Sequence, residues 1–134
     1  MKDREELNIW VPGEPVPQGS MRSPKAGLVL HSNPKLKSWR AEIGWAAKDC
    51  WRGSALLDGP VSLDCAFVFT RTKRPRHPFW RDTAPDLDKL IRAVGDALEG
   101  VVLSNDARIV RVSAHKKWAS PSSPPGASIG VWKL

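Results

Sequence analysis

Apolar residues along the chain follow two periods, and each period predicts one kind of element. From Val61 to Thr70, large apolar residues alternate with smaller or polar ones, which predicts a strand with one buried face. Apolar runs at Leu7–Val11, Ile109–Lys117 and Ala127–Leu134 predict three more strands. A further strand is expected at Ala26–His31, where it would form a loose hairpin with the first. The sequence thus predicts five strands.

Two segments repeat their apolar residues at helical spacing instead. The first follows Asn33 and Pro34, which suit the cap and first residue of a helix, and it ends near Gly53. The second begins at Asp86 as N-cap and ends at Gly100. The expected buried stripes are Leu36, Trp39, Ile43, Ala46, Ala47 and Cys50 in the first helix, and Leu87, Leu90, Ile91, Val94, Ala97 and Leu98 in the second.

Turn-forming residues separate these elements. The segments Gly13–Gly27, Arg71–Pro85 and Ala119–Gly126 lack a regular period and predict loops. The predicted order is β-β-α-β-α-β-β, which indicates an α+β fold with a small mixed β-sheet and two amphipathic helices. Because 134 residues suffice for one compact unit, we expect a single domain over residues 1–134.

The chain is basic overall, but many of its acidic residues are concentrated in one segment. The net charge of +7 and the isoelectric point near 9.9 point to a polyanionic partner, although membrane-surface proteins share this property. Six of the 14 acids lie between two basic segments: Asp82, Asp86, Asp88, Asp96, Glu99 and Asp106. Nucleic acid is repelled by such a group unless cations neutralise it, and a metal-dependent nuclease needs this arrangement.

Other functional classes are disfavoured. Cys50 and Cys65 match no metal-ligand spacing and are expected to be core residues. His31, His77 and His115 are scattered and suggest neither a metal site nor a triad. We expect no membrane segment, because no apolar stretch is long enough and the N-terminal MKDREE is charged. An intracellular protein is therefore expected.

The candidate chemistry lies at Asp86, Asp88 and Asp106. The first two stand at a helix start and the third in a polar turn before the next strand, so the three carboxylates can converge on a hard cation such as Mg²⁺. Each also has a purely structural interpretation. Asp86 suits an N-cap, Asp88 complements the helix dipole and Asp106 suits a turn. Spacing alone favours the structural interpretation, because a D-x-D pair is a weak motif.

A resemblance favours the catalytic interpretation. The segment PDLDKLIRAVGDALEGVVLSNDARIV at residues 85–110, followed by Lys116, resembles the central signature of RusA-type Holliday junction resolvases. The segment GEPVPQGSMR at residues 13–22 resembles the opening strand and basic loop of that family. This chain departs from the pattern at Lys89, where the family has Asn, at Arg92, where it has Lys, and at Asn105, where it has Asp.

The resemblance implies a homodimeric, metal-dependent endodeoxyribonuclease that resolves four-way DNA junctions by two matched cuts. The implied metal ligands are Asp86, Asp88 and Asp106, with Mg²⁺ as the ion and Mn²⁺ as an alternative. Arg92 takes the place of a functionally important lysine and, with Lys116, would offset developing negative charge. The residues expected to contact DNA are Arg71, Lys73, Arg74, Arg76, Lys89, Lys116 and Lys117. The resemblance also implies that the protein acts in the cytoplasm of a bacterium or of a phage-infected bacterium.

Two alternatives stay open. The substitutions at Lys89, Arg92 and Asn105 fit a non-catalytic junction- or DNA-binding relative that has lost the metal. The seven tryptophans fit a single-strand binder that stacks on bases, although most of them lie in core-like patterns. A dimer is expected because two matched cuts need two sites, and because Trp45 lies off the buried stripe of its helix.

Overall fold

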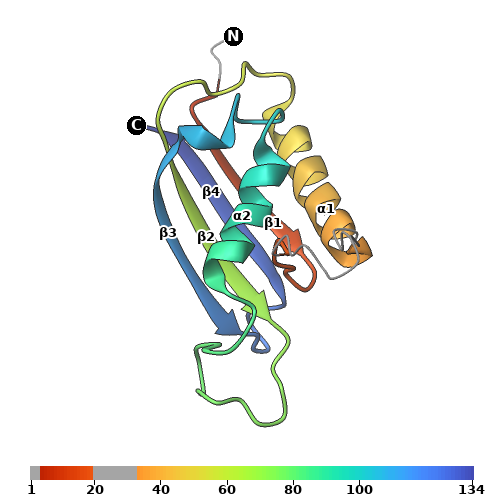
Figure 1. Cartoon of the computed structure of the whole chain (residues 1–134). Helices are drawn as coiled ribbons and strands as arrows, with labels where there is room; N and C mark the ends of the chain where they lie inside the picture. The colour runs from red at the N-terminus through yellow and green to blue at the C-terminus, as the bar shows by residue number, and fades with distance from the viewer. Residues whose placement is uncertain (1–3, 20–32) are drawn as a thin grey trace, which may run out of the picture.

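The computed structural model describes residues 4–19 and 33–134 (Figure 1). The elements are β1 (Glu6–Pro12), α1 (Pro34–Trp51), β2 (Val61–Phe69), α2 (Leu87–Leu98), the short 3-10 helix η2 (Asp106–Arg108), β3 (Ile109–Trp118) and β4 (Gly126–Lys133). This order confirms the predicted α+β class. The strand expected at Ala26–His31 lies outside the described residues.

The four strands form one mixed sheet in the order β1-β4-β2-β3. Strand β4 pairs antiparallel with both β1 and β2, whereas β2 and β3 are parallel. Parallel neighbours need a crossover connection, and α2 with its flanking loops supplies it. Strand β3 therefore lies at an edge of the sheet, and the loops at both ends of α2 lead to or from β2 and β3.

The helices cover one face of this sheet (Figure 1). The side chains of Leu63, Phe67 and Val131 on the inner face are fully buried. Of the predicted stripes, the fully or nearly fully buried members are Leu36, Trp39, Ile43, Ala47, Leu90, Val94 and Leu98. Burial of such side chains is the main favourable term for a small domain, at roughly 25 cal/mol per Å² of apolar surface.

The opposite face of the sheet is only partly accessible. Asn8, Trp10, His115 and Ser128 are exposed on it, whereas Ser62 and Val68 of β2 are buried. The expectation that β2 has only one buried face is therefore wrong. Among the described residues, no helix is both long and apolar enough for a membrane crossing.

Helix ends follow the expected chemistry. The side chain of Asn33 accepts a hydrogen bond from the backbone N–H of Lys35 at 3.0 Å, and Pro34 is the first helical residue. Helix α1 ends as Arg52 and Gly53 take φ values of 49° and 77°. Gly100, with φ at 80°, takes the left-handed conformation just after the cap of α2. The predicted start and end of each helix are confirmed to within two residues.

Both cysteines are free thiols, as the sequence predicts. Cys65 lies in the core, and its burial, with a smaller contribution from Asp64, raises the pKa of the thiol to about 12. Cys50 is half-buried against the same core.

Gly126 is a position where the fold tolerates no side chain. A Cβ there would lie 2.6 Å from the backbone oxygen of Val11 and 2.6 Å from the ring of Trp10. We expect Gly126→Ala to lower the free energy of unfolding by about 1 to 3 kcal/mol, as overpacking does. At Gly59 a Cβ would meet nothing within 4 Å, so Gly59→Ala should change the free energy of unfolding by less than about 0.5 kcal/mol. Equal urea denaturation midpoints for the two variants would contradict this account.

Candidate active site

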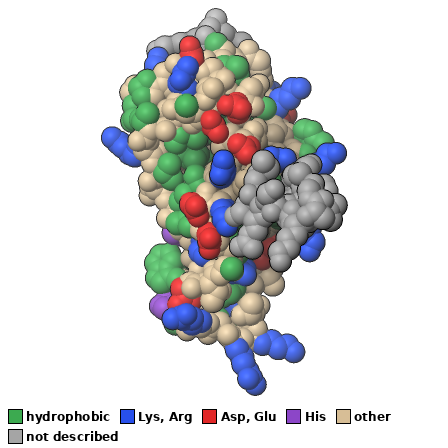
Figure 2. Space-filling view, in the orientation of Figure 1, with side chains coloured by type: hydrophobic (Ala, Val, Ile, Leu, Met, Phe, Trp, Pro, Cys, Tyr) green, Lys and Arg blue, Asp and Glu red, His purple; other side chains and the backbone are tan. Residues whose placement is uncertain are grey.

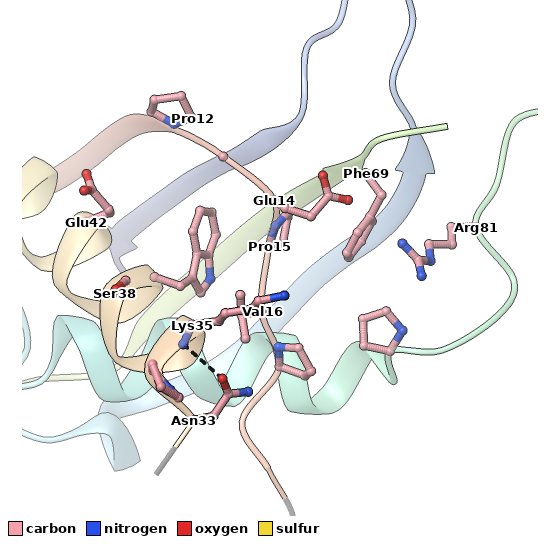
Figure 3. A pocket seen from close by; sticks show the side chains of 15 residues that line it. Pro12, Glu14, Pro15, Val16, Asn33, Lys35, Ser38, Glu42, Phe69 and Arg81 are labelled. Atoms are coloured by element: carbon pink, nitrogen blue, oxygen red, sulfur yellow. Dashed lines mark hydrogen bonds between the residues drawn. The ribbon is translucent and has the colours of Figure 1, made fainter. Parts of the chain in front are cut away.

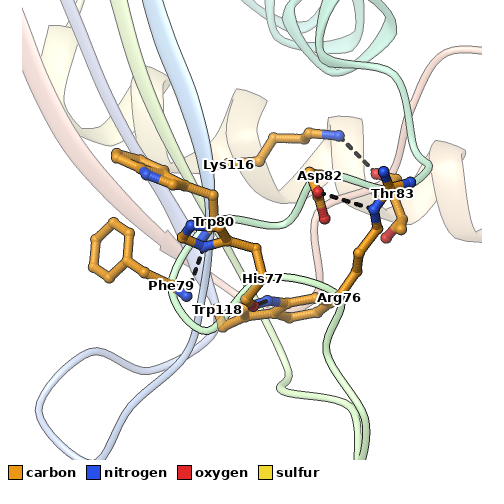
Figure 4. A network of polar contacts seen from close by, with 8 residues as sticks. All are labelled: Arg76, His77, Phe79, Trp80, Asp82, Thr83, Lys116 and Trp118. Atoms are coloured by element: carbon orange, nitrogen blue, oxygen red, sulfur yellow. Dashed lines mark hydrogen bonds and ion pairs between the residues drawn. The ribbon is translucent and has the colours of Figure 1, made fainter.

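The loop Arg71–Pro85 leads from β2 to α2 and is fastened to the edge strand β3 (Figure 4). The indole N–H of Trp118 donates to the carbonyl of His77 at 2.9 Å, and its backbone N–H donates to the carbonyl of Phe79 at 3.0 Å. The backbone N–H of Arg81 donates to the carbonyl of Lys116 at 3.2 Å. Trp118 is buried. The loop therefore takes its path from β3.

Lys116 fixes the last part of this loop. Its ammonium donates to the carbonyl oxygens of Thr83 at 2.7 Å and Pro85 at 2.6 Å, so it holds the segment that leads directly into Asp86 (Figure 4). Burial lowers the pKa of Lys116, the charge of Arg81 lowers it further, and Asp86 and Asp82 oppose the shift. The peptide bond between Ala84 and Pro85 is cis. Lys116 thus positions the start of α2 through the backbone.

Asp86 caps α2 by position but not by hydrogen bond. Its backbone is extended, with φ −68° and ψ 137°, yet its side chain accepts no cap hydrogen bond. The carboxylate is 66% exposed and lies 3.7 Å from the ammonium of Lys89. The structural role that spacing favoured for this side chain is therefore absent, and its oxygens stay accessible to a ligand.

The outward stripe of α2 carries Asp88, Arg92 and Asp96 at successive i+4 positions. Acidic side chains gather over α2 with Lys and Arg side chains among them (Figure 2). Asp96 pairs with Arg40 at 3.7 Å. Asp88 and Arg92 are exposed and form no ion pair within the described part of the chain. Both are free to meet a charged ligand.

Asp106 lies beyond the other end of α2, on η2, where several side chains position it. The backbone N–H of Asp106 donates to Glu99 Oε1 at 3.0 Å, and Asn105 Oδ1 accepts from the N–H of Ala107 at 2.8 Å. Arg108 pairs with Asp58 at 3.1 Å. The sequence marks Glu99 only as one of six clustered acids, and no motif marks Asp58.

Asp58 is a second support for this turn. Its carboxylate accepts a hydrogen bond from the hydroxyl of Ser104. This bond and the one from Arg108 lower the pKa of Asp58. The backbone of Leu57 exchanges hydrogen bonds with the same turn, donating to Val102 at 2.8 Å and accepting from Ser104 at 3.0 Å. The segment before β2 therefore fixes the turn that carries Asp106.

The three carboxylates are not brought together in this single chain. Asp106 lies beside Gly95, where a Cβ would be 3.8 Å from Cβ of Asp106. Gly95 is seven residues after Asp88, which places it about 10 Å farther along the helix axis at 1.5 Å per residue. Within residues 4–19 and 33–134, no three His, Cys, Asp or Glu side chains are grouped closely enough for one metal ion. The rise of α2 therefore keeps Asp106, which lies beside Gly95, away from the start of the helix.

The residues at the start of α2 nonetheless suit a hard cation. Mg²⁺ in phosphate-handling sites takes one or two carboxylates and fills its remaining positions with water and substrate oxygens. Asp86 and Asp88 offer exposed carboxylates on both sides of Leu87. The helix has no side-chain cap hydrogen bond from Asp86. The donor set therefore fits Mg²⁺ with open positions.

Basic residues extend the site along the loop. Arg71 donates to the carbonyl of Pro78 at 2.7 Å, and Arg76 pairs with Asp82 at 3.3 Å. Lys73 and Arg74 are exposed, and the described residues give them no acidic partner. Figure 2 shows Lys and Arg side chains that project from the end of the molecule where this loop lies.

The segment after β1 also reaches the start of α2. The backbone N–H of Gln18 donates to the carbonyl of Lys89 at 2.9 Å, and Arg40 donates to the Gln18 side chain at 3.4 Å. The remainder of the basic loop expected at residues 13–22 lies outside the described residues from Ser20 onward. The described part brings the N-terminal motif to α2.

An open pocket of about 1040 Å³ separates this segment from α1 (Figure 3). Its walls include Val16, Trp39 and Phe69, with Arg81 and Pro85 at one side. The guanidinium of Arg81 lies 4.4 Å from the ring centroid of Phe69. The pocket thus borders the loop that carries Asp86.

Comparisons with known proteins identify a family and a relative. The family model described as endodeoxyribonuclease RusA matches residues 12–129, which include all the carboxylates and basic residues described above. The protein of Bacillus subtilis (strain 168) described as uncharacterized protein YqaN is 27% identical over 123 residues, covering 82% of this chain and 86% of that protein.

The environment of Lys116 predicts its titration. Its pKa should lie below the ordinary 10.5, and Asp82→Asn should lower it further, because Asp82 favours the charged form. Since the unfolded chain then holds this proton more tightly than the folded one, the free energy of unfolding should rise with pH between the lowered pKa and 10.5. NMR of the side chain measures the shift, and Asp49→Asn on α1 is the control. A pKa that rises in Asp82→Asn would contradict the assignment.

Proposed function

The chain belongs to the RusA endodeoxyribonuclease family, and we propose that it is a metal-dependent enzyme that resolves four-way (Holliday) DNA junctions by paired phosphodiester hydrolysis. The observation that carries the proposal is the pair of exposed carboxylates, Asp86 and Asp88, at the start of a helix that lies beside a basic loop. The family match spans this helix and both of its neighbouring loops.

In this proposal Asp86 and Asp88 hold Mg²⁺, with Mn²⁺ as an alternative. The ion supplies Lewis acidity, which lowers the pKa of a bound water and stabilises charge on the phosphate. Asp106 is the third proposed carboxylate of the site. Because it lies beside Gly95, about two helical turns from Asp88, it would serve the ion through a water rather than by direct contact.

Arg92 is the proposed partner of the scissile phosphate. It lies one turn after Asp88 on the outward stripe, and its guanidinium can form two parallel hydrogen bonds to phosphate oxygens. Lys116 has two roles in the proposal: it offsets negative charge near Asp86, and it keeps the carbonyls of Thr83 and Pro85 in place.

DNA binding is assigned to the basic residues around this helix. Contacts from such side chains to phosphate position the duplex without reading its sequence. The proposed residues are Arg71, Lys73, Arg74, Arg76, Lys89, Lys116 and Lys117. All four on the loop are exposed, but Arg71 and Arg76 already have partners, whereas the described residues give Lys73 and Arg74 no acidic partner.

A second candidate function is a DNA-binding relative without cleavage. It is favoured by the ammonium of Lys89, which lies 3.7 Å from Asp86 and occupies the space beside a proposed ligand. It is also favoured by the separation of Asp106 from the other carboxylates. In this candidate the positive charge of Lys89 replaces the metal and the chain binds junctions without cutting them.

Asp88→Asn separates the two candidates. The change keeps the shape of the side chain but removes the charge that a hard cation requires. Cleavage of a four-way junction in Mg²⁺ should fall by several orders of magnitude, because metal activation of water supplies much of the rate. Junction binding without metal should be unchanged or tighter, since a charge that repels phosphate is gone.

The matched control is Asp49→Asn, the same change at an exposed residue of α1. It should cut junctions like the unmodified chain. Cleavage by Asp88→Asn at the rate of this control would exclude Asp88 as a ligand. Absence of cleavage by the unmodified chain in both Mg²⁺ and Mn²⁺, with junction binding intact, would favour the non-catalytic candidate.

We also propose a homodimer, because two matched cuts need two sites related by a two-fold axis. Trp45 on α1 is 65% exposed, which is unusual for so large an apolar side chain and makes it the proposed centre of the contact. Sedimentation at micromolar concentration should show a dimer, and Trp45→Glu should shift it toward monomer. A monomer for the unmodified chain, both free and on junction DNA, would contradict the proposal.

A further inference from the structure

Two adjacent aromatic side chains remain exposed on the loop before α2. Phe79 and Trp80 are 47% and 46% exposed. Their rings meet edge to face, with centroids 4.5 Å apart and an interplanar angle of 88°. A contiguous pair of large exposed rings is typical of a binding surface rather than of a solvated loop.

The backbone beneath the two rings is firmly held. The N–H groups of Phe79 and Trp80 both donate to Nδ1 of His77, at 3.0 Å and 2.9 Å. Trp80 forms a bridge with Lys117 of β3, and the carbonyl of Phe79 accepts from the N–H of Trp118. Such hydrogen bonding presents the rings in a fixed arrangement, which reduces the entropy lost on binding.

The surroundings of the pair are cationic. The ammonium of Lys117 lies 5.9 Å from the ring centroid of Phe79. The rings of His115 and Trp80 are T-shaped to each other with centroids 5.7 Å apart, and burial, with a further contribution from Lys117, lowers the pKa of His115. Among the described residues Lys117 has no acidic partner. Aromatic rings next to such a cation match the chemistry of nucleic acid, in which a flat base accompanies a phosphate.

The pair lies on the opposite side of β3 from the proposed catalytic groups. Figure 4 shows Phe79 and Trp80 on one side of the strand, with Asp82 and the ammonium of Lys116 on the other. The consecutive residues Lys116 and Lys117 point to opposite faces of the sheet, as neighbours in a strand do. DNA that reaches Asp86 would therefore meet the two rings only by passing around the edge of the sheet.

A continuous linear duplex keeps its bases stacked and offers the rings no free base face. At the branch point of a four-way junction, strands change partners, and a base next to the exchange can lose a stacking neighbour at small cost. We propose that Phe79 and Trp80 stack on one such nucleobase and give the chain its preference for branched over linear DNA. The inference rests on the proposed function, because it takes junction DNA as the ligand.

Metal-free binding tests the stacking without any dependence on cleavage. Fluorescence anisotropy compares a four-way junction with a linear duplex of matched sequence, for the unmodified chain and for the variant Phe79→Ala/Trp80→Ala. The alanine variant should bind the junction at least about 10-fold more weakly, with duplex affinity changed by less than about twofold. A junction with 2-aminopurine at the branch point should lose fluorescence on binding the unmodified chain and not on binding the variant.

The matched control is Phe79→Tyr/Trp80→Phe, which keeps two rings and should retain junction preference. Thermal unfolding of all variants verifies that the loop change leaves the fold intact. Equal junction affinity of the alanine variant, an equal loss on junction and duplex, or no junction binding by the unmodified chain would each overturn the stacking proposal. Loss of cleavage alone, with these binding results intact, would overturn only the catalytic proposal.

Discussion

Burial of the inner face of α2 is the constraint on which the rest of the site depends. Leu90, Val94 and Leu98 are fully buried against the sheet, so the helical period leaves Asp88 and Arg92 no direction but outward. The same helix forms the crossover between parallel strands β2 and β3, and its length therefore sets the separation of its two end loops. Apolar burial places the charged groups, although none of them contributes to the core.

The features that the sequence predicts correctly are those that depend on residues close together in the chain. The cap at Asn33 and the left-handed glycine at Gly100 each depend on neighbouring residues, and the structure has both. The alternation in β2 predicted the strand but not its burial, because Ser62 and Val68 on the second face are buried as well. The path of the loop Arg71–Pro85 was not predictable in this way. It follows from hydrogen bonds to Lys116 and Trp118, which lie more than 30 residues away in the chain, and no period in the sequence encodes such contacts.

The candidate site shows the same division. Sequence and resemblance found the charged residues of α2, including the outward position of Arg92, because helical spacing fixes their direction. They did not find the supports of the Asp106 turn, Glu99 and Asp58, whose roles arise only when segments distant in sequence meet. The convergence of Asp86, Asp88 and Asp106 was expected from their places at the start of a helix and in the turn after it, whereas the rise of α2 keeps Asp106 apart from the other two.

The attachment of the loop to β3 has an evolutionary consequence. The loop is fixed at Phe69 in the sheet, at His77 and Phe79 by Trp118, and at the carbonyls that Lys116 holds, while Lys73 and Arg74 between these points are exposed. Because the entropy of loop closure grows only slowly with length, insertions and deletions around Lys73 and Arg74 cost the fold little. The number of proposed phosphate contacts can then change in evolution without displacing Phe79, Trp80 or Asp86.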